Sequence, residues 1–161
     1  AEAEAPVQFL ALLSAPSFPE YAAIGAGAAG AIYPSQWEPG VEYTPEFGPS
    51  PAAFVQAYEA RYGSVPDYYA ASGFAAGLVL QHALERAGSL EPEAVHRALD
   101  ETDVVTFYGA LRFATEPLGH GMQVGHEMLL VQLQPGPDGT LVKEVVWPEA
   151  ARTRELLYPK R

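Results

Sequence analysis

The chain has 161 residues, a length that usually forms one domain with a hydrophobic core. Its 20 acidic residues outnumber its 9 basic residues, and the net charge of -11 disfavours nucleic acid and anionic membrane surfaces as partners. The absence of cysteine excludes disulfides, thiolate nucleophiles and cysteine-based metal sites.

The first 35 residues predict a strand, a helix and a second strand. Val7–Ala15 is a continuous apolar run of strand length, which suits a strand buried on both faces of a parallel sheet. Phe18–Ala29 is rich in alanine and predicts a helix, and Gly30 closes it. Ala31–Tyr33 predicts the second strand. This order is typical of one piece of a parallel α/β sheet.

A long loop and three helices follow. Residues 34–51 are rich in proline, glycine and aromatics, and loops of this length are often functional. A serine cap followed by proline predicts a helix over residues 51–62. Residues 67–87 are small and apolar nearly all round, which predicts a helix buried on several sides. A third, shorter helix is predicted over residues 92–100.

The C-terminal part predicts strands. Val104–Phe113 is strand-like around Gly109, and a glycine-rich turn follows it. Met128–Gln134 and Leu141–Trp147 are apolar runs joined by a PGPDG turn, which predicts a hairpin. The tail, residues 148–161, has little periodicity, and we expect it to wrap over the surface. The chain therefore supplies few strands for its three helices to cover.

Motifs for catalysis or for metal and phosphate binding are weak. The G-x-G-x-x-G pattern at 25–30 follows a helix-like segment, so a tightly packed helix end is favoured over phosphate binding. No two histidines are spaced i, i+4, and no second cluster of Asp or Glu frames them. Solvated or hydrogen-bonded histidine is therefore favoured over a metal site for His82, His96, His120 and His126. No nucleophile elbow or paired-carboxylate spacing is present. We therefore expect no enzyme activity, no metal and no cofactor.

Aromatic residues at the junctions of segments are the remaining candidates for function. Tyr68 and Tyr69 begin the central helix, Trp37 lies in the long loop, and Phe107 and Tyr108 precede a glycine. Such residues can line a concave ligand site in which hydroxyl groups hold a polar group. Packing in the core is the alternative for each of them.

Three stretches in this order resemble a known family: YGSVPDYYAA, AGSLEPEAV and TFYGALRF. With GAAGAIYPSQW before them and GHEMLLVQLQPG after them, the chain from Val7 to Pro159 resembles the C-terminal half of type I periplasmic solute-binding proteins. More narrowly, it is similar to the leucine-binding-protein-like receptors for branched-chain amino acids and amides in ABC uptake systems. The resemblance implies an α/β fold in which a sheet lies between two layers of helices (a three-layer α/β/α arrangement). In this family the fold has two lobes, and this chain would contain parts of both. The fold would be incomplete without an N-terminal half.

The resemblance also implies how the chain is divided. Residues 7–35 would end the second lobe, residues 36–113 would form the C-terminal part of the first lobe, and residues 114–161 would supply the hinge return, a hairpin of the second lobe and the wrapping tail. In this family the ligand binds between two hinged lobes. We expect an N-terminal half or self-association to cover the sheet edges and the apolar surface that this chain leaves exposed.

Few residues of a ligand site can be carried over. Tyr69, or Tyr68 in the alternative register, resembles an aromatic residue that covers the ligand. Leu13 and Ser14 lie where amino acid receptors present a carboxylate to the ligand's ammonium group. Because a buried ammonium without a countercharge is costly, this departure favours an amide, a carboxylate or an aromatic acid as ligand. Trp37 is expected either to touch the ligand or to close the hinge.

The resemblance implies the solute-binding component, or a fragment of it, of an ABC transporter, which binds a small amino acid, amide or carboxylate. It implies a membrane permease as partner and a periplasmic or extracellular location at the cell envelope. The alternative is an interaction or structural module that keeps half of the fold without an intact ligand site.

Overall fold

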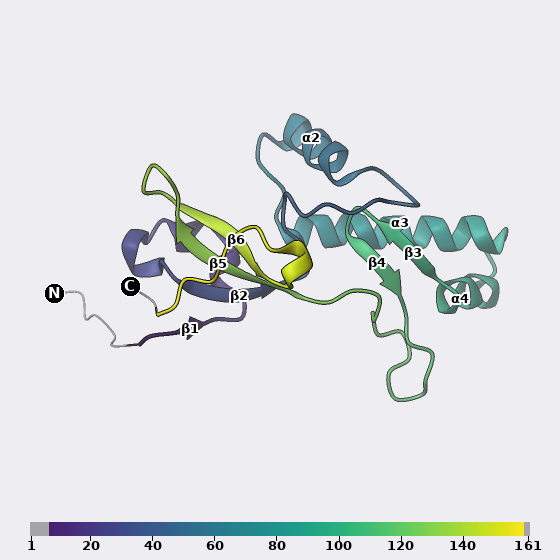
Figure 1. Ribbon diagram of the computed structural model, residues 1–161. Coiled ribbons are helices and arrows are strands. Elements are labelled where there is room, and N and C mark those ends of the chain that lie inside the picture. Colours follow the sequence, from purple (N-terminus) through teal and green to yellow (C-terminus); the bar gives the residue numbers. More distant parts are fainter. Residues whose placement is uncertain (1–6, 160–161) are drawn as a thin grey trace. The chain divides into compact units, whose positions relative to one another are not determined.

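The computed structural model describes residues 7–159, and these residues divide into two units (Figure 1). Unit 1 joins residues up to Ser35 with residues from Met128 onward. Unit 2 is the continuous segment Gln36–Glu127. The tail prediction for residues 160–161 lies outside the described residues.

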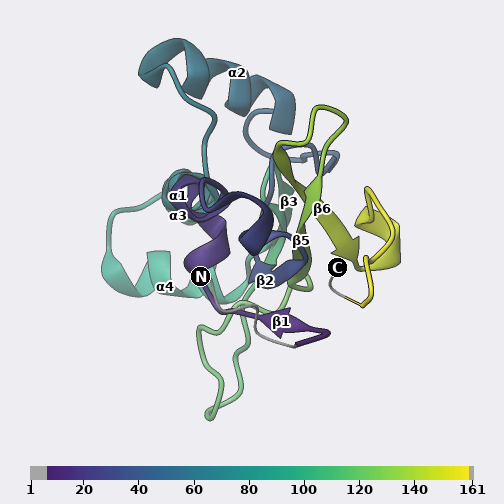
Figure 2. The same ribbon diagram turned by 90° about the vertical axis from the view of Figure 1, so that its left-hand side faces the viewer.

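Within its described residues, unit 1 contains a four-stranded mixed sheet (Figure 2). Strand β1 pairs in parallel with β2, and β2–β5 and β5–β6 are antiparallel pairs. The strands, in the order in which they lie side by side, are β1 (Leu10–Ala11), β2 (Ala31–Ser35), β5 (Leu129–Pro135) and β6 (Leu141–Trp147). The predicted hairpin of β5 and β6 is confirmed, because the turn residues between two apolar runs direct the chain back on itself.

The C-terminal tail is tied to β5 by two buried glutamine side chains. Gln132 Nε2 donates to the Leu157 carbonyl at 3.0 Å, and Gln132 Oε1 accepts from the Leu157 amide at 2.9 Å. Gln134 Nε2 donates to the Glu155 carbonyl at 2.8 Å. Because these amides give the tail backbone the partners that water would otherwise supply, the tail stays ordered with a single turn of 3-10 helix, η3 (Glu149–Ala151).

Two predictions for the start of the chain are wrong. The strand expected over Val7–Ala15 is only the two residues of β1, and most of its flanking residues are exposed, because β2 alone pairs with it among the described residues. The helix expected over Phe18–Ala29 is replaced by two short pieces, α1 (Pro19–Ala22) and η2 (Gly25–Ala28), since glycine weakens helices and Gly25 takes a φ of 77°. A turn of 3-10 helix, η1 (Ala15–Ser17), precedes them.

Unit 2 contains three helices at the predicted places: α2 (Pro51–Tyr62), α3 (Tyr68–Ala87) and α4 (Pro92–Asp100). Local signals explain their bounds. The Ser50 hydroxyl accepts from the Ala53 amide at 3.2 Å, and the Asp67 carboxylate accepts from the Ala70 amide at 2.8 Å. Left-handed glycines end α2 and α3.

The strand-like stretch Val104–Phe113 is a hairpin rather than one strand. Strands β3 (Asp103–Thr106) and β4 (Gly109–Arg112) pair in antiparallel fashion. Gly109 has a φ of 115°, which lets the chain reverse there. A Cβ atom at this glycine would also lie 3.2 Å from His126 Nδ1.

Helix α3 is buried on one face only, which corrects the prediction of a helix buried on several sides. Ala71, Ala75 and Leu78 are in the core of unit 2, whereas Phe74 and Leu80 are about half exposed. The buried face packs into the core with Phe54, Phe107 and Leu111, and α4 also packs against the helix (Figure 1). Among the described residues, no helix is long and apolar enough to cross a bilayer.

Candidate functional site

Trp37 belongs to the core of unit 2. Its side chain is 0% exposed, and its indole Nε1 donates to the Phe107 carbonyl at 3.2 Å. Its ring meets Phe54 and Phe107 edge to face, with centroids 5.8 and 6.0 Å apart. An indole with no exposed surface cannot touch a solute in this structure, so the geometry favours packing, and ligand contact by Trp37 stays a prediction without geometric support.

Tyr68 and Tyr69 form a stacked pair at the start of α3. Their ring centroids lie 4.0 Å apart at an interplanar angle of 30°. The Asp67 cap fixes the first turn of the helix, and with it the backbone of both residues. Tyr69 is 44% exposed and Tyr68 is partly buried. The pair thus offers an aromatic face to solvent beside the capped helix end.

The hydroxyl of Tyr68 stays neutral over a wide pH range. Burial is the main cause that raises its pKa, and a side-chain hydrogen bond with Tyr69 adds to it. The negative charge of nearby Asp67 acts in the same direction. A neutral phenol can both donate and accept a hydrogen bond, which suits the recognition of a carboxylate or an amide.

Tyr108 places a second hydroxyl near this pair. It lies in the turn between β3 and β4, is 4% exposed, and donates to Gln36 Oε1 at 3.3 Å. Burial raises the pKa of Tyr108 to about 12, although a hydrogen bond with Ser72 partly offsets this effect. The Ser72 hydroxyl also donates to the Tyr69 carbonyl at 2.9 Å, so it connects the helix start with this turn.

Tyr43 completes the group, because burial raises its pKa as well and its ring lies over the β3–β4 turn, against Gly109. We call the set Tyr43, Tyr68, Tyr69, Ser72 and Tyr108 the tyrosine cluster. Sequence reasoning found the helical pair and noted Tyr108, but it missed Tyr43 and Ser72. The one sequence signal for this cluster was Gly109 next to Tyr108, since a glycine allows other side chains to pack closely against the backbone. All five residues belong to unit 2, so the cluster stands on one unit alone.

Leu13 and Ser14, the other predicted contacts, lie in unit 1 directly after β1. Leu13 is 84% exposed. The Ser14 carbonyl accepts from the Ser17 hydroxyl at 2.6 Å and from the Ser17 amide at 2.9 Å, which shapes the turn into η1. Both side chains are at the surface, and neither carries a charge that could pair with an ammonium group.

Within residues 7–159, one group of three side chains has the chemistry and spacing to hold a metal ion: His96, Asp100 and His120. Two of them belong to α4, and the third lies in the loop after β4.

Comparison with known proteins links the chain to one family. The family model described as periplasmic binding protein matches residues 2–140. A solved structure of an ABC-type branched-chain amino acid transporter from Rhodopseudomonas palustris is 21% identical, with a TM-score of 0.63. The match covers 80% of this chain and 33% of that chain.

Two further solved structures hold a ligand. An ABC transporter substrate-binding protein from Desulfitobacterium hafniense, in complex with Leu, is 25% identical with a TM-score of 0.55, and the match covers 76% of this chain and 33% of that chain. A solute-binding protein of an ABC transporter from R. palustris, in complex with benzoate, is 20% identical with a TM-score of 0.58. That match covers 78% of this chain and 32% of the benzoate-bound chain. The chain thus spans about a third of the length of the structures that it matches.

These matches confirm the fold that the sequence motifs predict. The α/β architecture is a partial type I periplasmic-binding-protein fold, since it corresponds to about a third of each matched chain. The relatives are solute-binding proteins rather than enzymes. The chain belongs to the periplasmic binding protein family, whose model matches residues 2–140.

Proposed function

We propose that the chain is part of the solute-binding component of an ABC uptake transporter and has no enzymatic activity. The family match and the three solved structures support this proposal. A membrane permease would be its partner, and it would act in the periplasm or outside the cell, at the cell envelope. We further propose that unit 1 carries the second lobe and unit 2 the first, with residues 114–127 counted with unit 2.

The tyrosine cluster supports a small ligand with an apolar group and a carboxylate or amide. The exposed ring of Tyr69, stacked on Tyr68, carries the proposal, because it gives an apolar group a flat surface to cover. The neutral hydroxyl of the partly buried Tyr68 beside it can donate to a carboxylate or amide oxygen. Leucine and benzoate, which two relatives hold, share this combination of a carboxylate and an apolar part.

Leu13 and Ser14 bear on which of these ligands is preferred. By the resemblance they lie where amino acid receptors present a carboxylate to the ligand, and neither residue carries a charge. An amino acid brings an ammonium group, and burying that group without a countercharge costs several kcal/mol. Benzoate has no ammonium group, and neither does a simple amide. We therefore propose that an aromatic or aliphatic carboxylate, or a neutral amide, binds more tightly than leucine does.

The test is isothermal titration calorimetry of the 161-residue chain with benzoate, isobutyramide and leucine. We expect benzoate or isobutyramide to bind more tightly than leucine. Tyr69→Ala should weaken that binding about fivefold, since the lost contact is worth roughly 1 kcal/mol. Tyr62→Ala is the matched control, because Tyr62 is a 61% exposed tyrosine at the end of α2 and should leave affinity unchanged.

Absence of binding by all three probes at millimolar concentration would contradict an intact ligand site. Equal weakening by both tyrosine variants would contradict the assignment to Tyr69. The second candidate function is then an interaction module, which the exposed apolar residues of α3 favour.

A further inference from the structure

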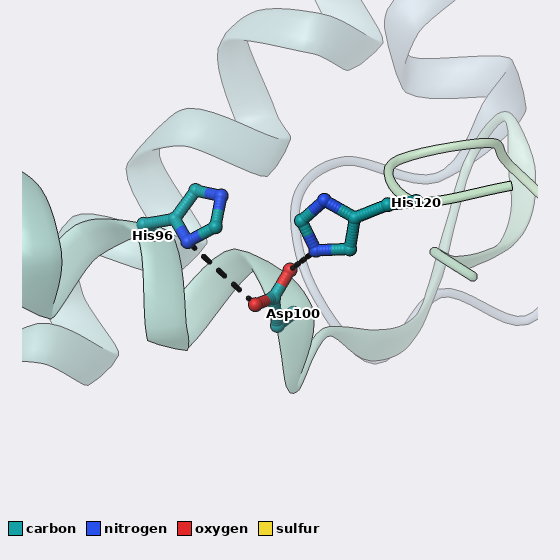
Figure 3. Close-up of side chains that lie close together, drawn as sticks. All are labelled: His96, Asp100 and His120. Atoms are coloured by element: carbon teal, nitrogen blue, oxygen red, sulfur yellow. Dashed lines mark hydrogen bonds and ion pairs between the residues drawn. The ribbon is translucent and has the colours of Figure 1, made fainter. Parts of the chain in front are cut away.

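His96 and Asp100 are four residues apart on α4, so they occupy the same face of the helix. Figure 3 shows the Asp100 carboxylate between two imidazole rings, with His96 on one side and His120 on the other. His120 comes from the loop that follows β4, twenty residues along the chain. The sequence suggested no pair of histidines at helical spacing and no cluster of Asp or Glu around the histidines, so the helical pair of His96 and Asp100 was missed.

The donor atoms are close enough to share one ion. His120 Nε2 lies 2.9 Å from Asp100 Oδ1, and His96 Nδ1 lies 3.6 Å from Asp100 Oδ2. The three ligand atoms all lie within 4.8 Å of one another. A tetrahedral zinc ion with bonds of about 2.0–2.1 Å needs its ligand atoms about 3.3 Å apart. Small side-chain rotations would therefore bring all three donors to bonding distance.

The backbone holds both sides of this group in place. Asp100 is the last residue of α4, a helix whose Ala98 is buried against its neighbours. The loop that carries His120 is closed by hydrogen bonds from the Ala114 amide to the Met122 carbonyl and from the Gly121 amide to the Ala114 carbonyl, both at 2.8 Å. The ligand side chains therefore lose less conformational entropy when an ion binds, because the backbone that carries them is already fixed.

We propose that His96, Asp100 and His120 bind a divalent transition metal, with Zn²⁺ as the best fit. Two imidazoles and a carboxylate are donors that zinc prefers, whereas magnesium and calcium prefer oxygen alone. The side chains are 62%, 31% and 40% exposed in the same order, so water has access to complete the coordination. Such an ion would fasten the loop after β4 to the end of α4. This site is separate from the proposed solute site and does not depend on it.

The test is calorimetric titration of the chain with zinc chloride at pH 7.5 in a buffer that does not chelate metals. We expect one zinc ion per chain with a dissociation constant in the micromolar range or below. Asp100→Asn and His120→Ala should each weaken binding at least tenfold. Glu101→Gln is the charge-matched control, since Glu101 pairs with Arg86 at 3.9 Å and lies outside the group, so it should keep the affinity. Magnesium chloride should give no binding.

Hydrogen exchange supplies a second readout that separates a metal site from a nonspecific charge effect. Zinc should slow exchange of the loop amides at 114–122 in the native chain, and it should leave them unchanged in His120→Ala. Circular dichroism without metal checks that each variant is folded. No zinc binding below about 100 μM would overturn the proposal, and so would equal binding by the native chain and both ligand variants.

Discussion

A single hydroxyl, that of Tyr108, shows how burial changes the chemistry of one residue. The side chain is 4% exposed, and its hydroxyl is shared with Gln36 and Ser72. Burial disfavours the charged phenolate, which raises the pKa from 10.0 to about 12. In the unfolded chain the same group ionises near its ordinary value. The folded chain therefore holds this proton at pH values where the unfolded chain has lost it.

We expect the free energy of unfolding to fall as the pH rises from about 10 to 12, because the unfolded chain then binds fewer protons than the folded chain. Below the unfolded pKa this contribution is fully present, and above about pH 12 it is lost. Tyr108→Phe should make the fall less steep and cost about 1 kcal/mol at pH 7 through the lost hydrogen bonds. Urea unfolding at pH 7, 10 and 11.5 measures both effects. Equal pH dependence in the native chain and the variant would contradict the assignment.

At the scale of elements, the sheet of unit 1 depends on polar groups as well as on apolar packing. Val131 and Leu133 of β5 are fully buried, and Gln132, between them in the sequence, is 1% exposed. Besides its two bonds to Leu157, Gln132 donates to the Gly30 carbonyl at 3.2 Å and accepts from Gln134 at 2.9 Å. A buried amide with all these partners joins the tail, β2 and β5 into one structure.

Gln132→Leu is expected to destabilise the chain by about 1–3 kcal/mol, because it leaves the Leu157 amide and carbonyl without their protein partners. Hydrogen exchange at the Leu157 amide should become faster at the same time. Gln56→Leu is the control, since Gln56 is exposed on α2 and should change stability by less than about 0.5 kcal/mol. Unchanged exchange at Leu157 in the first variant would show that the tail is held by other contacts.

At the scale of the whole molecule, α3 carries an apolar stripe that the described residues leave exposed. The stripe consists of Tyr69, Gly73, Ala76 and Leu80, which share a helix face by their i, i+4, i+7 and i+11 spacing. Leu80 is 51% exposed, and the small residues at 73 and 76 let another surface approach closely. The chain also matches only about a third of the length of its relatives. Self-association through this stripe is therefore a prediction that follows from its exposure.

We expect sedimentation equilibrium to show association of the native chain that grows with concentration in the range of tens of micromolar. Leu80→Gln should weaken it, because a polar group on the stripe must lose its water in the contact. Leu90→Gln is the control, since Leu90 is 84% exposed in the loop after α3 and is not part of the stripe. A native chain that stays monomeric at every concentration would refute self-association.

The sequence by itself determined the three helices of unit 2, the hairpin of β5 and β6, and the family. Caps, breakers and turn residues act over a few positions, so Ser50, Asp67 and the PGPDG turn set these elements without help from the rest of the chain. The ordered motifs around YGSVPDYYAA predicted the family that the comparison confirms.

Tertiary structure alone decided which residues meet. Apolar content predicted a long buried strand at the start of the chain, but burial needs neighbours on both sides, and β1 has β2 alone among the described residues. Trp37 could have lined a site or a core, and contacts with Phe54 and Phe107, far along the chain, place it in the core. The pairing of Asp100 with His120 likewise joins positions twenty residues apart. Such contacts depend on how helices and loops pack against one another. A local sequence pattern does not determine that packing, so these contacts could not be predicted from it.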